Sequence, residues 1–319
     1  MKVIRTVLGD ISPQELGFTD THEHLIIDRD YVLVQNPDYR LDNVEKTSQE
    51  VKTFLDAGGK SFVEMTCLAF GRSAKKLIQV SKQTGAHIIA STGFHRPNFY
   101  IDSHWRFFYS VDQIARIMIE EIEQGMDENQ YNGPLIDQTS AKAGVIKIAT
   151  GYYVIKPEDE VTIHAAAIAQ QETGAPIFTH TDGGTLGLEQ IEMLGSFGVA
   201  PEHITVGHFD RNPDIFLHKE LAQTGCYLEY DTPSRRKYFP ESHFVELVKK
   251  MVTGGFGKQI LWGGDLSRRS YQTAYGGQPG LAYILKKFIP RLRMEGFNDD
   301  IINNIFINNP GNALSFEKK

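Results

Sequence analysis

Two histidines two positions apart are the first feature of the sequence that could carry chemistry. His22 and His24 lie in the segment 18–27, whose apolar residues and β-branched threonines predict a buried strand. Side chains two positions apart on a strand point to the same face, so both imidazoles would project together. Such a pair at the end of a buried strand is suited to binding a metal ion, although two core or surface histidines could alternate in the same way.

Four more residues with ligand or charge chemistry lie within other apolar runs or at their ends. They are Lys147 in 144–150, His180 in 176–181, His208 in 204–208 and Asp265 in 260–265. Taken singly, each histidine could be a hydrogen-bonded core residue, the aspartate could cap a turn, and the lysine could reach a carboxylate. An unpaired ammonium is costly to bury, however, and it has no lone pair for a metal ion. Taken together, the six residues predict a binuclear metal site.

The elements that would position these residues alternate between strand and helix. Continuously apolar runs predict strands covered on both faces at 18–27, 61–67, 87–93, 144–150, 176–181, 204–208, 227–231 and 260–265. Amphipathic stretches predict helices at 43–57, 73–84, 111–126, 157–172, 186–197, 213–224, 240–254 and 280–295. This alternation predicts an α/β fold, a (β/α)8 TIM barrel, rather than a doubly wound open sheet with a glycine-rich phosphate loop. In such barrels the chemistry lies at the carboxyl ends of the strands.

The composition limits the class of protein. No shift in composition marks a second domain, so residues 1–319 are expected to form one domain. The formal net charge is −7 and no basic tract occurs, so no nucleic acid partner is expected. The sequence has no apolar run near the roughly 20 residues of a membrane span, and it shows no signal-peptide pattern. We therefore expect no membrane partner. The two cysteines form neither a metal-binding nor a disulfide pattern, so a cytoplasmic protein is expected.

Two structural questions stay open at this point. The aromatic-rich stretch 94–133 after the third strand could be a lid, a dimer contact or ordinary barrel packing. Dimers are common among such barrels, so a homodimer is one option for the oligomeric state, but no interface is recognisable in the sequence.

The motifs around the six residues resemble those of a known family. They are His22-Glu-His24, Val145-Ile-Lys147-Ile-Ala, Phe178-Thr-His180-Thr-Asp, Val206-Gly-His208, Gly263-Gly-Asp265 and the closing Asn308-Asn-Pro310. Essentially from end to end, the sequence resembles the phosphotriesterase-like branch of the amidohydrolase superfamily. Deaminases of that superfamily are disfavoured, because they lack the bridging lysine. They also carry a catalytic glutamate shortly after the fifth-strand histidine, where this sequence has Thr-Asp-Gly-Gly.

The resemblance implies how the six residues would share two divalent metal ions. His22, His24 and Asp265 would hold the more buried ion, and His180 and His208 the more exposed one. Carbon dioxide would convert Lys147 to a carbamate, which would bridge the two ions together with a hydroxide. Histidine and carboxylate ligands suit zinc, with manganese, cobalt or iron as other occupants.

Such a centre would hydrolyse a lactone, a phosphotriester or an amide. Two metal ions lower the pKa of a bridging water and polarise a carbonyl or phosphoryl oxygen. Asp265 would take the proton of the attacking hydroxide and pass it to the leaving alkoxide. Asp265 and Lys147 are therefore the expected catalytic residues, but the metal centre alone does not choose the substrate.

Basic and tyrosine side chains gather on the loops after the seventh and eighth strands. The first loop carries Arg235, Arg236 and Lys237, and the second carries Arg268, Arg269 and Tyr271. TIM barrels often bind phosphate at these two loops, and such side chains donate hydrogen bonds to it. Neighbouring arginines cannot all face inward, so part of each cluster is expected to be solvated. Four acidic residues could reach sugar hydroxyls but are each interpreted as turn residues: Asp182, Asp210, Glu229 and Asp231.

The resemblance also implies a substrate. Family members that open lactones of phosphorylated sugars carry a comparable lysine on the first loop, and an arginine and a tyrosine three apart on the second. Lys237, Arg268 and Tyr271 match these positions, and Arg235 is a fourth candidate for binding phosphate. Quorum-lactone hydrolases instead have apolar loops, and phosphotriesterases have aromatic pockets. The segment Thr92-Gly-Phe-His95-Arg96 also lacks the tyrosine of the lactone-quenching branch.

The expected activity is therefore hydrolysis of a phosphorylated sugar lactone, by attack of a metal-bridging hydroxide on the ring carbonyl. The alternative is a lactonase for unphosphorylated or acyl-homoserine lactones with promiscuous phosphotriesterase activity. A non-catalytic metal-binding or ligand-binding barrel is a remote alternative, because none of the six ligands is missing from the sequence.

Overall fold

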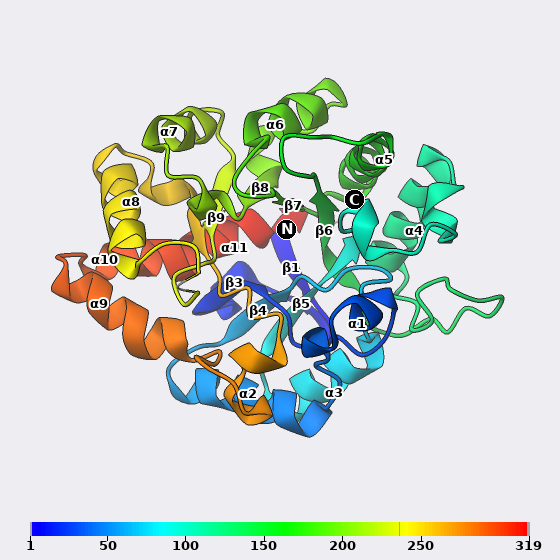
Figure 1. Cartoon of the computed structure of the whole chain (residues 1–319), viewed down its shortest axis with the longest axis horizontal. Helices are drawn as coiled ribbons and strands as arrows, with labels where there is room; N and C mark the ends of the chain where they lie inside the picture. Colours follow the sequence, from blue (N-terminus) through cyan, green and yellow to red (C-terminus); the bar gives the residue numbers. More distant parts are fainter. Residues whose placement is uncertain (1, 236, 318–319) are drawn as a thin grey trace.

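The computed structural model describes residues 2–235 and 237–317, and its centre is a barrel of eight parallel strands (Figure 1). In chain order these are β3 (Thr19–Glu23), β4 (Ser61–Glu64), β5 (His87–Gly93), β6 (Ala143–Ala149), β7 (Ile177–His180), β8 (Ile204–Gly207), β9 (Tyr227–Tyr230) and β10 (Ile260–Trp262). The backbone N–H groups of Gly264 and Asp265 donate to the carbonyl oxygen of His22, at 3.2 and 2.7 Å, and join the last strand to the first. The predicted (β/α)8 barrel is confirmed.

Helices cover the outside of the barrel (Figure 1). They are α2 (Val44–Asp56), α3 (Ala74–Thr84), α4 (Val111–Glu123), α5 (Pro157–Thr173), α6 (Gly187–Ser196), α7 (Ile215–Gln223), α8 (Glu241–Thr253) and α9 (Ile289–Met294). The predicted capping box is present at α4, where Ser110 and Gln113 bond reciprocally to the backbone. Gly85 and Gly174 end α3 and α5 in the left-handed conformation that glycine adopts at little cost. Within the described ranges, no helix combines the length and the apolar character needed to cross a membrane.

The predicted helix at 280–295 is only partly regular. A π-helical turn at Ile284–Phe288 precedes α9, so the hydrogen-bond pattern changes within the segment. Three further short helices complete the chain: α1 (Tyr31–Gln35), α10 (Asp299–Asn303) and α11 (Asn309–Leu314). The sequence patterns did not predict these short elements, which is consistent with their length of five or six residues.

A small antiparallel sheet joins segments from the two ends of the described chain and was not predicted. It contains β1 (Lys2–Thr6), β2 (Gly9–Ile11) and β11 (Phe316–Glu317). Lys2 pairs with Glu317, so the two ends of the described chain lie side by side. The backbone N–H of Val7 donates to the carbonyl oxygen of Ile88 at 2.8 Å, which ties this sheet to β5.

The excursion after β5 packs on the barrel and supports the site. The guanidinium of Arg106 lies 4.7 Å from the ring centre of Phe94 and 4.5 Å from that of Tyr100. Its Nη1 donates to the carbonyl oxygen of His95 at 2.7 Å, which fixes the backbone beside the cavity described below. Its Nη2 donates to Oγ1 of Thr162 on α5 at 3.1 Å, so this part of the excursion packs against a helix of the barrel.

Candidate metal centre and substrate cavity

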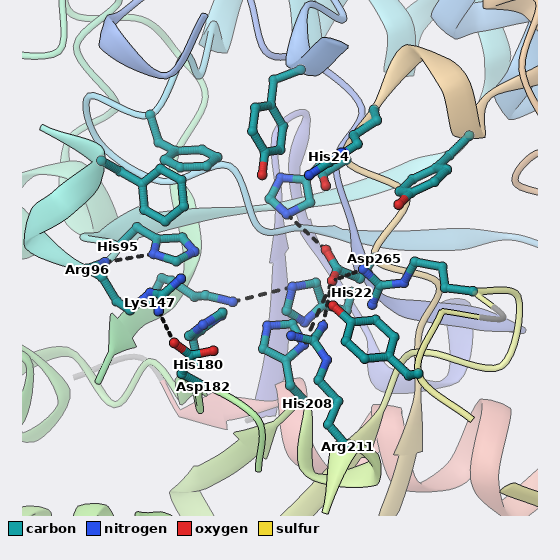
Figure 2. Close-up of a pocket in the computed structure, with 18 of the residues that line it drawn as sticks. His22, His24, His95, Arg96, Lys147, His180, Asp182, His208, Arg211 and Asp265 are labelled. Atoms are coloured by element: carbon teal, nitrogen blue, oxygen red, sulfur yellow. Dashed lines mark hydrogen bonds and ion pairs between the residues drawn. The ribbon is translucent and has the colours of Figure 1, made fainter. Parts of the chain in front are cut away.

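One cavity at the carboxyl ends of the barrel strands is lined by every site residue predicted from the sequence (Figure 2). The predicted metal ligands in it are His22, His24, Lys147, His180, His208 and Asp265. The predicted phosphate-binding residues in it are Arg235, Lys237, Arg268 and Tyr271. Parallel strands in a barrel end at one rim, which is why residues up to 249 positions apart in the chain meet there.

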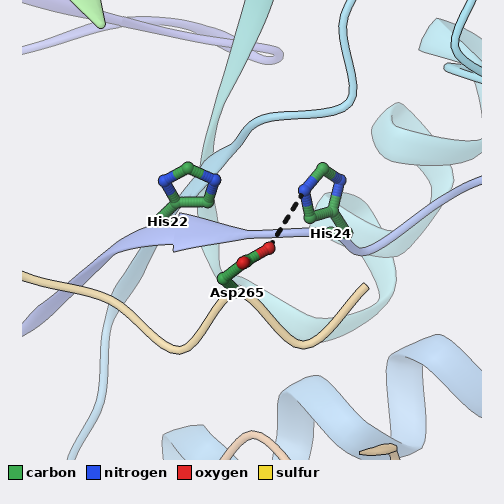
Figure 3. Close-up of side chains that lie close together, drawn as sticks. All are labelled: His22, His24 and Asp265. Atoms are coloured by element: carbon green, nitrogen blue, oxygen red, sulfur yellow. Dashed lines mark ion pairs between the residues drawn. The ribbon is translucent and has the colours of Figure 1, made fainter. Parts of the chain in front are cut away.

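His22, His24 and Asp265 form one group of side chains that could ligate a metal ion (Figure 3). Their ligand atoms lie within 4.8 Å of one another, and His24 Nε2 is 3.6 Å from Asp265 Oδ1. Glycine makes this approach feasible, because a Cβ on Gly263 would lie 2.5 Å from the Cβ of His22. Asp265 itself has a φ of 48°, so a left-handed turn directs its carboxylate over the barrel mouth.

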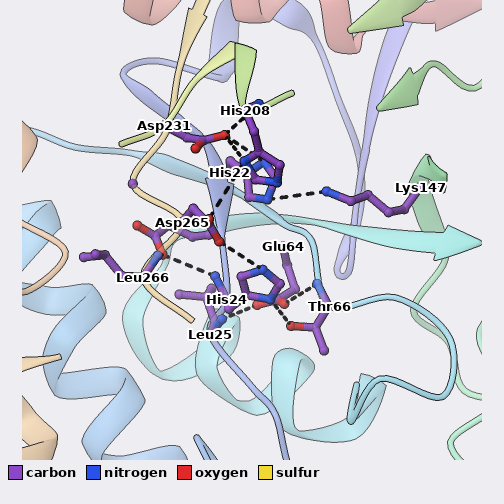
Figure 4. Close-up of polar contacts among 12 residues, drawn as sticks. His22, His24, Leu25, Glu64, Thr66, Lys147, His208, Asp231, Asp265 and Leu266 are labelled. Carbon is purple, nitrogen blue, oxygen red and sulfur yellow. Dashed lines mark hydrogen bonds and ion pairs between the residues drawn. The ribbon is translucent and has the colours of Figure 1, made fainter. Parts of the chain in front are cut away.

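Oxygen atoms behind the histidines hold the imidazole rings in place (Figure 4). The pairs are His22 Nδ1 with Glu229 Oε2 at 2.6 Å, His24 Nδ1 with Thr66 Oγ1 at 2.8 Å, and His208 Nδ1 with Asp231 Oδ2 at 2.6 Å. Because Nδ1 is engaged in each ring, Nε2 is the nitrogen left for a ligand in the cavity. The interpretation of Glu229 and Asp231 as turn residues is wrong, since both are fully buried behind these rings.

Burial also keeps the histidines neutral, as metal binding requires. It lowers the pKa of His24 to about 4 and the pKa of His22, His180 and His208 well below the ordinary histidine value. Within the described ranges, Nε2 of His180 is buried without a hydrogen-bond partner, and the ring lies 4.4 Å from that of His208. An orphaned imidazole nitrogen beside a second imidazole is the arrangement expected of a site built for a cation.

Lys147 is the unusual member of the group. Its side chain is buried, and its Nζ lies 3.4 Å from His22 Nε2. Among the described residues, no carboxylate oxygen forms an ion pair with Nζ. Burial lowers the pKa of Lys147, although the nearby carboxylates of Glu229, Asp231 and Asp265 oppose this shift. The neutral amine is therefore easier to reach here than in an exposed lysine.

Two guanidinium groups neutralise the carboxylate of Asp265. Arg235 Nη1 lies 2.6 Å and Arg211 Nη2 2.8 Å from Asp265 Oδ2. Burial alone would raise the pKa of Asp265, but Arg235 and the other nearby cationic groups outweigh it and hold that pKa well below its usual value. Arg235 also lies 3.2 Å from an Asp231 oxygen, so its guanidinium is already bonded to carboxylates. Its role in binding phosphate stays a prediction.

The remaining predicted phosphate residues form one side of the cavity, which we call the cationic pole: Lys237, Arg268 and Tyr271. Arg268 lies 5.9 Å from the ring centre of Tyr271 and 5.1 Å from that of Tyr39. Its neighbour Arg269 is exposed and lies over Tyr275 instead, as expected for adjacent arginines that cannot both face inward. Arg236 lies outside the described residues.

Comparison with known proteins decides the family. The model of the phosphotriesterase family matches residues 2–314. A phospho-furanose lactonase from Mycoplasmopsis synoviae (strain 53) is 38% identical over 328 residues, which cover 100% of this chain and 93% of the relative. The chain belongs to the phosphotriesterase family. It is therefore a hydrolase.

Solved structures agree with membership of the phosphotriesterase family. An amidohydrolase from Mycoplasma synoviae matches with a TM-score of 0.96 at 37% identity, over 100% of this chain and 93% of that one. A lactonase from Listeria monocytogenes matches with a TM-score of 0.91 at 36% identity, over 99% of this chain and 100% of that one.

The histidine and aspartate groups of this family member could bind metal, and two groupings compete on distance alone. One is His22 with His24 and Asp265, and the other is His22 with His208 and Asp231. Asp231 lies on the Nδ1 side of both rings, 3.7 and 2.6 Å away, where it acts as a hydrogen-bond acceptor. The first group faces the cavity, and we take it as the start of the metal centre.

Several cavity residues were not assigned a role from the sequence. His95 and Arg96 follow β5, Asp182 follows β7, and Arg211 follows β8. Each lies two to four residues beyond a strand end, which is the one sequence signal that could have indicated them. Asp182, interpreted as a turn residue, does lie at a bend before a turn, and it also forms an ion pair with Arg96 at the cavity wall.

Proposed function

We propose that the chain is a metal-dependent lactonase that opens the ring of a sugar lactone bearing a terminal phosphate. The observation that carries this proposal is the position of the cationic pole in the same cavity as the six candidate metal ligands. Arginine and lysine bind phosphate through charge-assisted hydrogen bonds, and a tyrosine hydroxyl adds a neutral donor. The activity in the names of the relatives from Mycoplasmopsis synoviae and Listeria monocytogenes supports the same reaction class.

The residues fit two divalent metal ions. His22, His24 and Asp265 would hold one ion, and His180 and His208 the other. Lys147 would act as a ligand to both ions once it is converted to a carbamate. The neutral amine is the form that adds carbon dioxide, and burial lowers the pKa of this side chain. Zinc suits this donor set, with manganese, cobalt or iron as other occupants. When bound, the metal ions supply a hydroxide nucleophile at neutral pH and polarise the carbonyl.

The protein side chains would then move the proton. Arg211 and Arg235 hold Asp265 as a carboxylate, so it enters the reaction able to accept a proton and not to donate one. Once protonated, it can deliver that proton to the ring oxygen as the carbon–oxygen bond breaks. The cationic pole would hold the phosphate during these steps. Binding at this remote group would orient the lactone carbonyl relative to the metal ligands.

An unphosphorylated lactone is the second candidate, because Phe70 and Phe99 also line the cavity and present apolar surface. The two candidates differ in what the cationic pole contributes. The deciding measurement is kcat/KM for matched lactones with and without the phosphate, on metal-loaded protein, for the wild type and for Lys237→Ala and Arg268→Ala.

We expect each substitution to raise KM for the phosphorylated lactone by roughly tenfold to a hundredfold, the worth of a hydrogen bond to a charged group. Hydrolysis of the unphosphorylated lactone should change little. Arg269→Ala is the matched control, since Arg269 is exposed on the same loop. An equal fall in kcat/KM for both lactones would show that Lys237 and Arg268 do not bind the phosphate.

A further inference from the structure

A second charged pair lines the cavity away from the cationic pole. Arg96, three residues beyond β5, forms an ion pair through Nη1 with Oδ2 of Asp182, two residues beyond β7. Figure 2 shows this pair beside His95 and His180, on the side of the cavity away from Asp265 and Arg211. The side chains of Arg96 and Asp182 are 21% and 35% exposed, so the pair is within reach of a ligand.

The ion pair leaves hydrogen-bonding capacity unused. Within the described part of the chain, Nη1 of Arg96 is bonded to Asp182 and Nε is buried without a partner, which leaves Nη2 as the donor that a ligand can reach. Over the same residues, the carboxylate of Asp182 accepts only from Arg96, through Oδ2. A guanidinium with a spare donor beside a carboxylate with a spare acceptor is suited to a group that both donates and accepts, which is what a hydroxyl does.

Aromatic side chains hold this pair in position. Arg96 lies 5.6 Å from the ring centre of Phe99, which packs edge-on against His95 at 4.4 Å. His95 in turn stacks on Phe70 at 5.1 Å, and its Nδ1 accepts from the backbone N–H of Arg96 at 2.7 Å. The guanidinium is therefore fixed before any ligand arrives, so binding loses little side-chain entropy there.

We propose that the Arg96–Asp182 pair is a specificity determinant that recognises the ring hydroxyl next to the lactone carbonyl. This inference rests on the proposed function. In a five-membered sugar lactone, the phosphate-bearing arm and the hydroxyl-bearing carbon lie on opposite sides of the carbonyl. If the cationic pole takes the phosphate and the carbonyl lies among the histidines, the hydroxyl faces the opposite wall, where Arg96 and Asp182 lie.

The same pair would exclude alkyl substituents. An alkyl chain in this place would take water from two charged groups and return no hydrogen bond, which costs binding energy. Sites built to hydrogen-bond a hydroxyl reject analogues that lack it more strongly than apolar pockets reject an extra group. The Arg96–Asp182 pair would therefore select hydroxylated rings over alkyl lactones, while the metal ligands treat both alike.

The test compares the lactone of a phosphorylated pentose with the matched analogue that lacks the hydroxyl next to the carbonyl. Steady-state kinetics are measured on metal-loaded wild type, Asp182→Ala and Arg96→Met, with the Tm of each variant as a check on folding. We expect the wild type to prefer the hydroxylated lactone by roughly tenfold to a hundredfold in kcat/KM. In both variants, kcat/KM should fall for the hydroxylated lactone and stay nearly unchanged for the analogue, so most of the preference is lost.

Asp299→Asn is the control, because it breaks an exposed ion pair with Arg293 outside the cavity and should leave the preference intact. Equal losses on both lactones in Asp182→Ala and Arg96→Met would overturn the inference in favour of a structural role. A wild type that opens both lactones equally well would overturn it too, while the proposed function stands. If the wild type opens no phosphorylated lactone, the proposed function fails and the inference with it.

Discussion

Glu229 offers a direct test of how the metal ligands are held. Its carboxylate is fully buried and accepts from His22 Nδ1 at 2.6 Å, a charge-assisted hydrogen bond that orients the ring. The substitution Glu229→Gln keeps an acceptor of nearly the same shape but removes the charge. A hydrogen bond to a charged group contributes about 1.5–3 kcal/mol and a neutral one about 1 kcal/mol, so roughly 0.5–2 kcal/mol is lost. That corresponds to metal binding weakened about twofold to thirtyfold.

The assay is competition for zinc against a chelating indicator, which reports Kd without relying on turnover. Glu50→Gln is the matched control, because Glu50 is equally buried but bonds to Thr273 and the backbone of Ala274, outside the cavity. Its metal Kd should equal that of the wild type.

Stability measured without metal separates positioning from folding. Burial raises the pKa of Glu229 well above its usual value, which shows that the carboxylate is costly to bury. The metal-free Tm of Glu229→Gln should therefore not fall below that of the metal-free wild type. An unchanged zinc Kd, or an equal loss of affinity in Glu50→Gln, would refute the positioning role of Glu229.

Three further outcomes follow from the structure. Lys147→Ala should lose bound metal and lactone hydrolysis, and a short-chain carboxylic acid should restore part of both; retention of full activity would exclude the bridging carbamate. Glu121→Gln should lower the free energy of unfolding by about 3–5 kcal/mol in urea titrations, because Arg72 and Glu121 form a fully buried ion pair and the substitution leaves the guanidinium without a counter-charge. Asp159 should make stability fall with rising pH, because burial raises its pKa from 3.8 to about 6 and the folded state therefore holds the proton more tightly. That contribution is present below about pH 4 and lost by about pH 6, so Asp159→Asn should flatten this part of the profile; an identical profile would show that Asp159 is not the group responsible.

The barrel and the metal ligands could be predicted because both depend on local sequence. Strand and helix alternation appears in runs of a few residues, and a strand end determines where its last side chain points. His180 is the last residue of β7, and His208 follows β8 directly, so the rim position of each followed from its own run. The small sheet of β1, β2 and β11 was missed because its strands, KVIRT, GDI and FE, lack the continuous apolar runs that indicated the barrel strands.

The partners behind the ligands could not be predicted, because their contacts are non-local. Glu229 is 207 positions from His22, and Thr66 is 42 positions from His24. A glutamate inside the apolar segment of β9 was a visible anomaly, but nothing in the sequence indicates which nitrogen it would face. Arg235 shows the same limit, since nothing in the sequence indicates that this basic loop residue would form an ion pair with Asp265.

The pattern of satisfied charges indicates how an anionic substrate would be oriented. Three of the arginines that line the cavity are already paired: Arg96 with Asp182, and Arg211 and Arg235 with Asp265. In the described residues, Lys237 and Arg268 have no carboxylate within 4.0 Å, so the free positive charge lies at one pole. A net charge of −7 on the chain gives no hint of this, because that total does not show where charge is left unpaired. In the proposed function, an anionic group would be drawn to Lys237 and Arg268, and the opposite end of the same molecule would face Arg96 and Asp182.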